Sequence, residues 1–579
     1  MRKKIALYFL FVLLFEICRL LFLCYHQDVY GAYALGDWLS AMWHGLPHDL
    51  SSAGYVMALP FLLQLVYLWI PGQWHTAFMR FWIRLVLVLI LLIVLGDLYL
   101  YSYWGFRIDN TALFYLLDSP GEAVGQAPVW MLILAAVEFF VAWYLLQKLF
   151  CRLYPGRAHG ARLCMLTGKE RAWHAGAALL LCGLIFLAIR GGVTPATMNV
   201  GRVYFSSEMP LNHAATNPVF SFIYSMSHKK KDFSKQYRFM KADEAATAYE
   251  ELNRGYSSQG NSGCAFDSLA SAVCLDSLAN LDTLSVRSQL LSEKRPNIVL
   301  LILESFAGAA CTGVYAEADS TILPNVNRMY REGIGFSNIF ANSFRTDRGC
   351  ASILAAYPAQ PTNSVMKDQK RSNNLQHLSK RLKEQGYDLS FVHGGDVNFT
   401  NMRGFLTAGG FEQIVGDENF PVSDRLSKWG VPDHVMFNYL YDQVTQETEQ
   451  PFMKVMLTLS SHEPFDVEYH HFEDEYVNSI AYADSCLGSF IDRLKQTPAW
   501  DNLLIIGIAD HAFARYPIGI QNHEVLRYRI PMFWTGGAIQ QPQIVATYGS
   551  QTDLAATLLQ QMQIEHSDFN FSKDLMNDS

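Results

Sequence analysis

The sequence predicts a two-part protein, with an N-terminal all-α transmembrane domain of five helices and a C-terminal α/β domain built on a mostly parallel sheet. Long apolar runs are confined to the first third of the 579 residues. From Pro296 onward, short apolar runs alternate with amphipathic segments, which is typical of strands alternating with helices. The mean hydropathy of +0.09 is too low for a chain embedded in a membrane throughout, and it fits an average over two such halves.

Five apolar runs are each long enough to cross a hydrocarbon core of roughly 30 Å. They cover residues 5–25, 52–70, 78–100, 127–150 and 172–189. The first run follows MRKK and could be a signal peptide, but its length, the lack of a small-residue cleavage site and the four later runs favour a retained helix. We therefore expect a transmembrane domain at residues 1–190.

The distribution of Lys and Arg predicts the orientation. Basic residues lie at the N-terminus, at 71–84 and at 151–171, whereas 26–50 has none and 102–126 has one. Five spans then place everything after residue 190 outside the cytoplasm. Glu16, Arg19 and Glu138 fall in or near these spans, where ionisable groups are either functional or paired with one another, and both interpretations stay open.

Residues 191–295 are expected to form an extracytoplasmic connector along the membrane surface. The segment is polar, with an aromatic-rich stretch at 203–225 and a basic cluster, HKKK, at 228–231. Cys264 and Cys274 could form a disulfide in an external compartment, but three further cysteines downstream leave an odd number, so the pairing stays open.

The C-terminal domain, residues 296–579, is expected to contain buried parallel strands. NIVLLIL at 297–303 is a continuous apolar run, as strands covered on both faces have. Further strands are expected at 335–340, 388–393, 412–416, 453–459, 502–509 and 530–534. Helices are expected at 347–356, 375–385, 433–447, 476–496 and 552–562.

Polar side chains follow several of these strands, where parallel sheets bind ligands. They are Glu304, Thr346, His393, His462, Asp510 and His511. Each alone is more often a helix cap or a structural group, but together they can meet in one crevice. Carboxylates and imidazoles are ligands for Mn²⁺, Zn²⁺ or Mg²⁺. Such a cation could activate the Thr346 hydroxyl as a nucleophile, and the helix after it would direct N–H groups at an anion.

The order of these motifs resembles that of a known family. LESF, RTDRG followed by YP, HGG with a downstream Arg, SSHEPF and ADH occur in this order. The order, together with the five-span anchor, resembles the lipoteichoic acid synthase family of phosphoglycerol transferases, which belong to the sulfatase-like, alkaline phosphatase superfamily. The resemblance covers nearly the whole chain.

The resemblance implies roles for individual residues. Glu304, Thr346, Asp510 and His511 match the site of a single divalent metal, most often Mn²⁺, with Thr346 as the nucleophile. The groups that match substrate-binding positions are His393, Arg403 and His462. The resemblance also implies a phosphatidylglycerol donor, an envelope polymer or glycan acceptor, and a location in the bacterial cytoplasmic (inner) membrane. The net charge of −8 gives no basic field for nucleic acid.

The sequence departs from the family pattern at two places. HGGDVNFTNMR spaces His393 and Arg403 differently and has Phe399 or Thr400 where a Trp is usual. RTDRG replaces a glycine-rich stretch around the nucleophile. The metal site is still expected despite these departures, whereas the shape of the substrate pocket and the identity of the acceptor stay open.

Three other functions compete with this interpretation. A sulfatase would need a C-x-P-x-R-like motif, and Cys350 has no Arg four residues on. A phosphoethanolamine transferase would share the anchor, fold and threonine but typically has several external disulfides. An inactive scaffold would be expected to have lost a metal ligand. His523 could also face the crevice, although a structural role is the expectation.

Overall fold

The computed structural model describes residues 2–110, 112–113, 129–154, 166–227, 240–241, 243–248, 290–292, 295–360, 363–447 and 451–576. Cys264, Cys274 and most of the expected connector, including the HKKK cluster, lie outside these residues. The chain divides into two compact units. The first comprises 1–229, 359–440 and 453–460, and the second comprises 230–358, 441–452 and 461–579.

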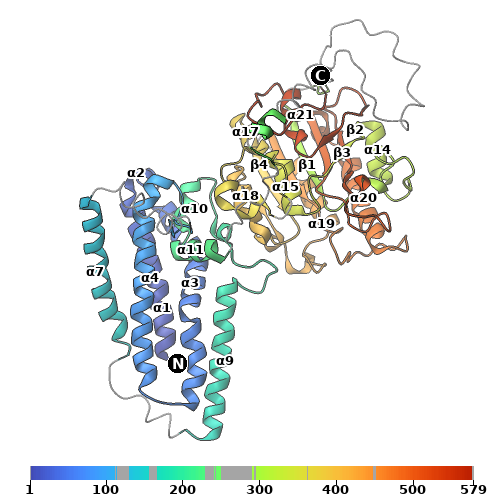
Figure 1. Ribbon diagram of the computed structural model, residues 1–579. Helices are drawn as coiled ribbons and strands as arrows, with labels where there is room; N and C mark the ends of the chain where they lie inside the picture. Colours follow the sequence, from blue (N-terminus) through green and yellow to red (C-terminus); the bar gives the residue numbers. More distant parts are fainter. Residues whose placement is uncertain are drawn as a thin grey trace. The chain divides into compact units, whose positions relative to one another are not determined.

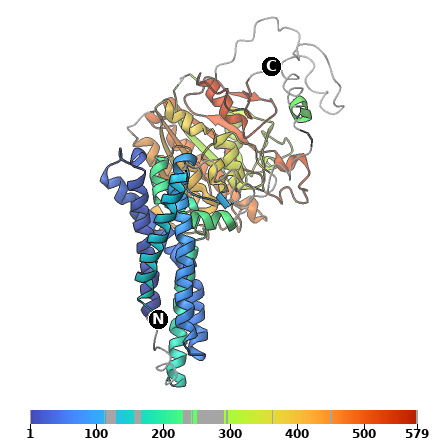
Figure 2. The same ribbon diagram turned by 60° about the vertical axis from the view of Figure 1, so that its left-hand side comes forward.

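Five helices of the first unit are long and apolar enough to cross a membrane, as the sequence predicts. They are α1 (Arg2–Tyr25), α3 (Leu35–Trp69), α4 (Trp74–Trp104), α7 (Val129–Cys151) and α9 (Gly168–Arg190), and they run alongside one another (Figures 1 and 2). The segment 26–50, expected as an external loop, is mostly helical: it holds the short α2 (Gln27–Tyr30) and the first half of α3. At 35 residues, α3 is about 52 Å long and exceeds the hydrocarbon core.

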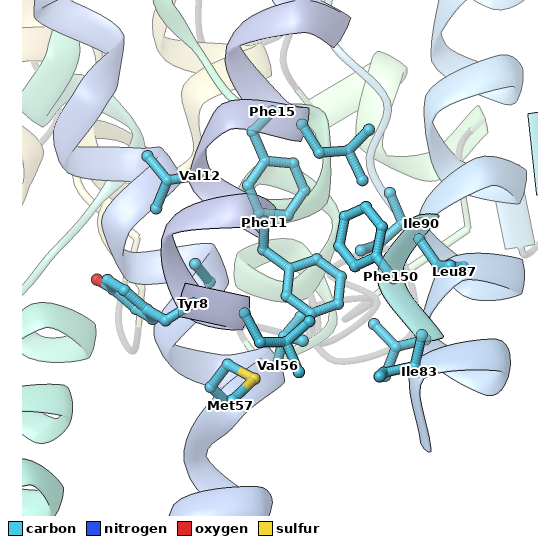
Figure 3. Close-up of a cluster of buried hydrophobic side chains, with 14 of the residues drawn as sticks. Tyr8, Phe11, Val12, Phe15, Val56, Met57, Ile83, Leu87, Ile90 and Phe150 are labelled. Atoms are coloured by element: carbon cyan, nitrogen blue, oxygen red, sulfur yellow. The ribbon is translucent and has the colours of Figure 1, made fainter. Parts of the chain in front are cut away.

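Apolar side chains from all five of these helices pack into one core, part of which is drawn in Figure 3. Phe11 of α1 lies against Phe150 of α7, with ring centroids 4.9 Å apart. Large apolar side chains on the outward faces are exposed, for example Leu13 and Phe140, as expected where lipid is the solvent. Pro60 leaves the Val56 carbonyl of α3 without a helical partner, and this oxygen accepts a hydrogen bond from Trp82 of α4 at 2.9 Å.

The ionisable groups flagged in the spans are paired. Arg19 forms a bidentate ion pair with Asp49 of α3, both distances 2.8 Å, and a second pair with Glu16 at 2.8 Å. Glu138 of α7 accepts a hydrogen bond from Tyr99 of α4 at 2.9 Å. Of the two interpretations that the sequence leaves open, these contacts favour pairing.

Three short helices follow the bundle: η1 (Val200–Val203), α10 (Met209–Ala215) and α11 (Pro218–Ser227). They are largely buried, and they belong to the described part of the expected connector. The guanidinium of Arg19 donates to the carbonyls of Ala214 and Ala215, and Asn217 donates to Asp49 at 2.7 Å. A buried ion pair at the end of the bundle therefore holds these helices in place.

The second unit contains a largely parallel sheet in the strand order β1-β7-β8-β2-β9. Its strands are β1 (Asn297–Leu303), β7 (Leu503–Ala509), β8 (Met532–Thr535), β2 (Ile334–Phe336) and β9 (Gln543–Val545). β1 and β7 are parallel and fully buried, with Leu303 opposite Ala509. β8 is antiparallel to both of its neighbours.

The single strand expected at 335–340 is wrong, because the chain changes sheets there. β2 ends at Phe336, and β3 (Ile339–Phe340) pairs instead with β10 (Gly549–Ser550). Ser337 donates to the carbonyl of Val545, and the carbonyl of Asn338 accepts from Gly549. The helices of this unit are α14 (Pro324–Glu332), α15 (Thr346–Ala355), α20 (Glu475–Leu494) and α21 (Asp553–Gln561).

The first unit also contains an α/β portion. Its strands lie in the order β5-β4-β6, with β4 (Asp388–His393) parallel to β5 (Gln413–Val415), and β6 spans Phe452–Leu457. The helices are α16 (Gln369–Ser372), α17 (Leu378–Glu384), α18 (Met402–Ala408) and α19 (Asp433–Thr445). β4 has the bounds expected from the sequence.

Candidate active site

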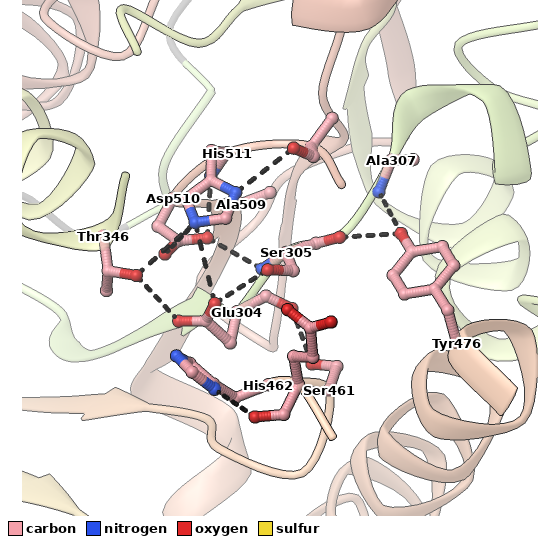
Figure 4. A network of polar contacts seen from close by, with 12 residues as sticks. Glu304, Ser305, Ala307, Thr346, Ser461, His462, Tyr476, Ala509, Asp510 and His511 are labelled. Atoms are coloured by element: carbon pink, nitrogen blue, oxygen red, sulfur yellow. Dashed lines mark hydrogen bonds and ion pairs between the residues drawn. The ribbon is translucent and has the colours of Figure 1, made fainter. Parts of the chain in front are cut away.

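Glu304 follows β1 directly and is held by its neighbours (Figure 4). Ser305 has a φ of 59°, which turns the chain sharply at the strand end, and its hydroxyl donates to Glu304 Oε1 at 2.7 Å. Ser461 donates to the Glu304 carbonyl at 2.6 Å, and Tyr476 donates to the Ser305 carbonyl at 2.7 Å. The carboxylate of Glu304 is thus fixed at the edge of the sheet.

Asp510 and His511 follow β7, the parallel neighbour of β1, so their side chains reach the same edge. Asp510 Oδ1 accepts from the backbone N–H groups of Ser305 (2.8 Å) and His511 (2.7 Å). His511 Nδ1 donates to the carbonyl of Ala512 at 3.2 Å, which leaves Nε2 as the ligand atom. Nε2 lies 3.5 Å from Asp510 Oδ2 and 3.6 Å from Glu304 Oε1.

Thr346 is the first residue of α15. Its Oγ1 donates to Glu304 Oε2 at 3.1 Å and lies 3.4 Å from His511 Nε2. One turn later, Gly349 packs against the backbone of Asp510 so closely that a Cβ there would lie 2.2 Å from the Asp510 carbonyl oxygen. A glycine therefore allows the helix that carries Thr346 to approach the strand end that carries Asp510.

The ligand atoms of Glu304, Asp510 and His511 all lie within 4.8 Å of one another and could hold a metal ion. Burial and the charge of Asp510 raise the pKa of Glu304, and burial raises the pKa of Asp510 to about 6. Burial lowers the pKa of His511, which keeps its imidazole neutral. Two carboxylates buried side by side repel each other, and a divalent cation among them would relieve that cost, so the donor set fits a metal.

Of the three expected substrate-binding residues, one lies at this cluster and two belong to the other unit. His462 is close enough to Glu304 and His511 to affect the pKa of both, and its Nδ1 donates to the Glu463 carbonyl at 2.9 Å (Figure 4). His393 and Arg403 belong to the first unit. His393 Nδ1 donates to the carbonyl of Leu457 at 3.1 Å, and Arg403 pairs with Glu418 at 2.6 Å.

His523, whose place in the sequence also allowed it to face the crevice, is exposed. The second unit thus brings together five of the seven expected site residues, namely Glu304, Thr346, His462, Asp510 and His511.

Supporting residues were missed by the sequence reasoning. Ser305 and Ser461 lie within the LESF and SSHEPF motifs. A side-chain oxygen close to a strand-end carboxylate in these motifs would have predicted both as supporting residues. Tyr476 and Arg527 gave no such signal. Arg527 is 2% exposed and donates to the Ala512 carbonyl, the same oxygen that accepts from His511. It therefore supports the orientation of the His511 ring.

Part of the chain is similar to known proteins. The family model described as Sulfatase matches residues 296–564. The chain is 25% identical over 309 residues to phosphoglycerol transferase I of Xanthomonas campestris pv. campestris, covering 49% of this chain and 43% of that protein. It is 23% identical over 286 residues to a lipoteichoic acid synthase-like protein of Bacillus subtilis, covering 44% and 46%. In both cases the chain spans under half the length of its relative.

Solved structures are similar to about half of the chain. An alkaline phosphatase superfamily protein of Vibrio parahaemolyticus has 28% identity and a TM-score of 0.44, covering 50% of this chain and 71% of that one. A lipoteichoic acid synthase of Listeria monocytogenes has 20% identity and a TM-score of 0.44, covering 50% and 78%. The family match and the relatives agree that residues 296–564 of this chain are similar to proteins of the sulfatase family.

Proposed function

We propose that the protein is a membrane-anchored, metal-dependent transferase that moves a phosphoglycerol headgroup from phosphatidylglycerol to an envelope polymer or glycan, through a covalent intermediate on Thr346. One observation carries the proposal: the Thr346 hydroxyl lies at a helix N-terminus within 3.4 Å of two members of a buried Glu-Asp-His cluster. The names of the relatives supply the headgroup.

Glu304, Asp510, His511 and the Thr346 hydroxyl would hold one divalent cation, and Mn²⁺ is the ion we expect. When bound, the cation supplies positive charge beside the threonine and phosphoryl oxygens. Thr346 Oγ1 attacks phosphorus and its proton passes to solvent, while the bond to the diacylglycerol oxygen breaks and that oxygen is protonated to give diacylglycerol. An acceptor hydroxyl then displaces Thr346 and takes over the phosphoglycerol group. Because Thr346 is the first residue of α15, the helix N-terminus lies at the nucleophile, and helix N-termini favour anionic groups such as a phosphoryl group.

His462 is our candidate for donating a proton to the departing oxygen, because it lies beside Glu304 and its ring is oriented by a backbone carbonyl. Arg403 and His393 remain candidates for binding the headgroup. Five apolar helices support a membrane location, where a donor lipid would arrive by diffusion in the bilayer. The inner membrane and an extracytoplasmic site follow from the positive-inside pattern and are part of the proposal.

A phosphoethanolamine transferase is the second candidate, because it would use the same threonine. Cys311, Cys350 and Cys486 are free and buried in the described part of the chain, which does not favour the disulfide-rich rival. A sulfatase is disfavoured because Cys350 is buried in α15 and Leu354 stands where the motif needs an Arg.

The test is release of labelled diacylglycerol from phosphatidylglycerol by the full-length protein in vesicles, with Thr346→Ala alongside. We expect release by the wild type and a loss of at least 1,000-fold in the variant, the order seen when a covalent nucleophile is removed. Unchanged release in Thr346→Ala would refute the nucleophile. Labelled phosphatidylethanolamine in the same assay decides between the two headgroups, since turnover of that lipid alone would favour the second candidate.

A further inference from the structure

The loop that leads into α18 carries Arg403 and has an unusual backbone. Thr400 and Asn401 have φ values of 54° and 66°, both in the left-handed region that side chains with a Cβ disfavour. Such conformations cost of order 1–3 kcal/mol each and persist where surrounding contacts fix them. Something must therefore hold this loop, residues 396–403, against its own backbone preference.

The segment at 196–202, which follows the last membrane helix, makes those contacts, and we call it the strap. Its Asn199 donates from Nδ2 to the Asn398 carbonyl at 2.6 Å. The N–H of Gly201 donates to Asn401 Oδ1 at 3.0 Å, and the N–H of Ala196 donates to Asp396 Oδ2 at 3.3 Å. Arg202 lies 3.9 Å from Asp396 Oδ1 and completes the set.

The strap reaches Arg403 through one intervening residue. Asn398, whose carbonyl accepts from Asn199, accepts the Nε–H of Arg403 on its side-chain oxygen at 3.1 Å. Asp396 fixes the same Asn398 by accepting from its backbone N–H and from Nδ2, both at 2.9 Å. The guanidinium of Arg403 is thus oriented on one side by Asn398 and on the other by Glu418.

The other end of the chain of contacts lies on a membrane helix. His48 of α3 is fully buried and donates from Nε2 to the Asn199 carbonyl at 3.0 Å. Its ring stacks on Phe220 of α11 with centroids 4.1 Å apart. Asn199 is itself 6% exposed, so its amide is not solvated and its hydrogen bonds are not readily replaced by water.

From this continuous path we infer that Asn199 is a positioning residue for Arg403, through which the membrane part of the chain sets the geometry of the headgroup-binding loop. This inference rests on the proposed function, in which Arg403 binds the headgroup. A strap that merely packs would stabilise the fold without acting through Arg403, and the two cases differ in a double-mutant cycle.

The experiment compares Asn199→Ala, Arg403→Ala and the double variant in the full-length protein in vesicles, with Thr197→Ala as control. Thr197 lies in the strap, and its side chain is exposed. We expect Asn199→Ala to lower kcat/KM for the lipid donor about 10-fold, Arg403→Ala to lower it about 100-fold, and the double variant to equal Arg403→Ala. Thr197→Ala should leave kcat/KM unchanged. A double variant whose losses multiply to about 1,000-fold would overturn the inference.

Hydrogen–deuterium exchange separates this inference from the proposed function. Asn199→Ala should speed exchange at residues 396–404 at least 10-fold while leaving residues 504–508 of the core sheet unchanged. This result would show that Asn199 holds the Arg403 loop even if the wild type did not turn over phosphatidylglycerol, which would refute only the proposed function. Unchanged exchange at 396–404 would overturn the inference whatever the activity.

Discussion

Gly349→Ala tests whether the approach of α15 to the strand end creates the site. The added Cβ would lie 2.2 Å from the Asp510 carbonyl oxygen, 2.8 Å from its carbon and 3.0 Å from its Cα. Ordinary contact begins at 3.4 Å, so helix and strand end must separate by about 1.2 Å (3.4 − 2.2). The obstructing atoms are backbone and cannot rotate away.

That displacement would stretch the 3.1 Å hydrogen bond from Thr346 to Glu304 beyond its useful length. A misplacement of 1 Å in reacting groups costs on the order of 100-fold in rate, and overpacking costs about 1–3 kcal/mol of stability. We expect Gly349→Ala to lose about 100-fold in diacylglycerol release while keeping its folded structure by circular dichroism. Gly176→Ala in α9, where a Cβ meets nothing within 4 Å, is the matched control. Wild-type activity in Gly349→Ala would refute the reasoning.

Three further outcomes follow from particular contacts. Glu304→Gln should reduce the Mn²⁺ bound to the purified protein at least 10-fold, as measured by elemental analysis, with His523→Ala as the control. Equal metal content in the two variants would count against the Glu304–Asp510–His511 metal site. Burial lowers the pKa of His377 to about 4, below the 6.5 of the unfolded chain. The stability contributed by neutral His377 should therefore be full above pH 6.5 and fall by up to about 3 kcal/mol toward pH 4. His377→Gln should flatten this part of the plot of melting temperature against pH, and an unchanged plot would exclude His377 as the cause. Asp49→Ala removes the bidentate partner of buried Arg19 and should lower the free energy of unfolding by about 3–5 kcal/mol. The measurement is the melting temperature in detergent, which should fall. A melting temperature equal to that of the wild type would show that the ion pair is dispensable.

The parts that the sequence predicted well are those with a local signal. β1 has the expected bounds because a continuous apolar run marks a buried strand, and β4 has them because its buried residues Leu389, Phe391 and Val392 lie between polar ends. Glu304, Asp510 and His511 could be placed together because parallel neighbouring strands bring their carboxyl ends to one edge. The five spans were found because length and hydropathy suffice for that purpose.

The remainder depends on contacts that are distant in sequence. The first half of α3 was missed because His44, Pro47, His48 and Asp49 interrupt its apolar pattern, and their partners, such as Arg19, lie elsewhere. The division of 335–340 into two strands depends on pairing with residues near 545 and 549. The Asn199–Asn398 contact joins residues 199 positions apart, and no local sequence pattern at either residue predicts the contact.

The central claim is that Thr346 carries the headgroup during transfer. The most direct measurement is mass spectrometry of the full-length protein, quenched in acid after mixing with phosphatidylglycerol and Mn²⁺ in the absence of an acceptor, followed by peptide mapping. The account predicts one added phosphoglycerol group on the peptide that contains Thr346, and no adduct in Thr346→Ala. An adduct on another residue, or active turnover of phosphatidylglycerol in which no adduct ever forms, would contradict it.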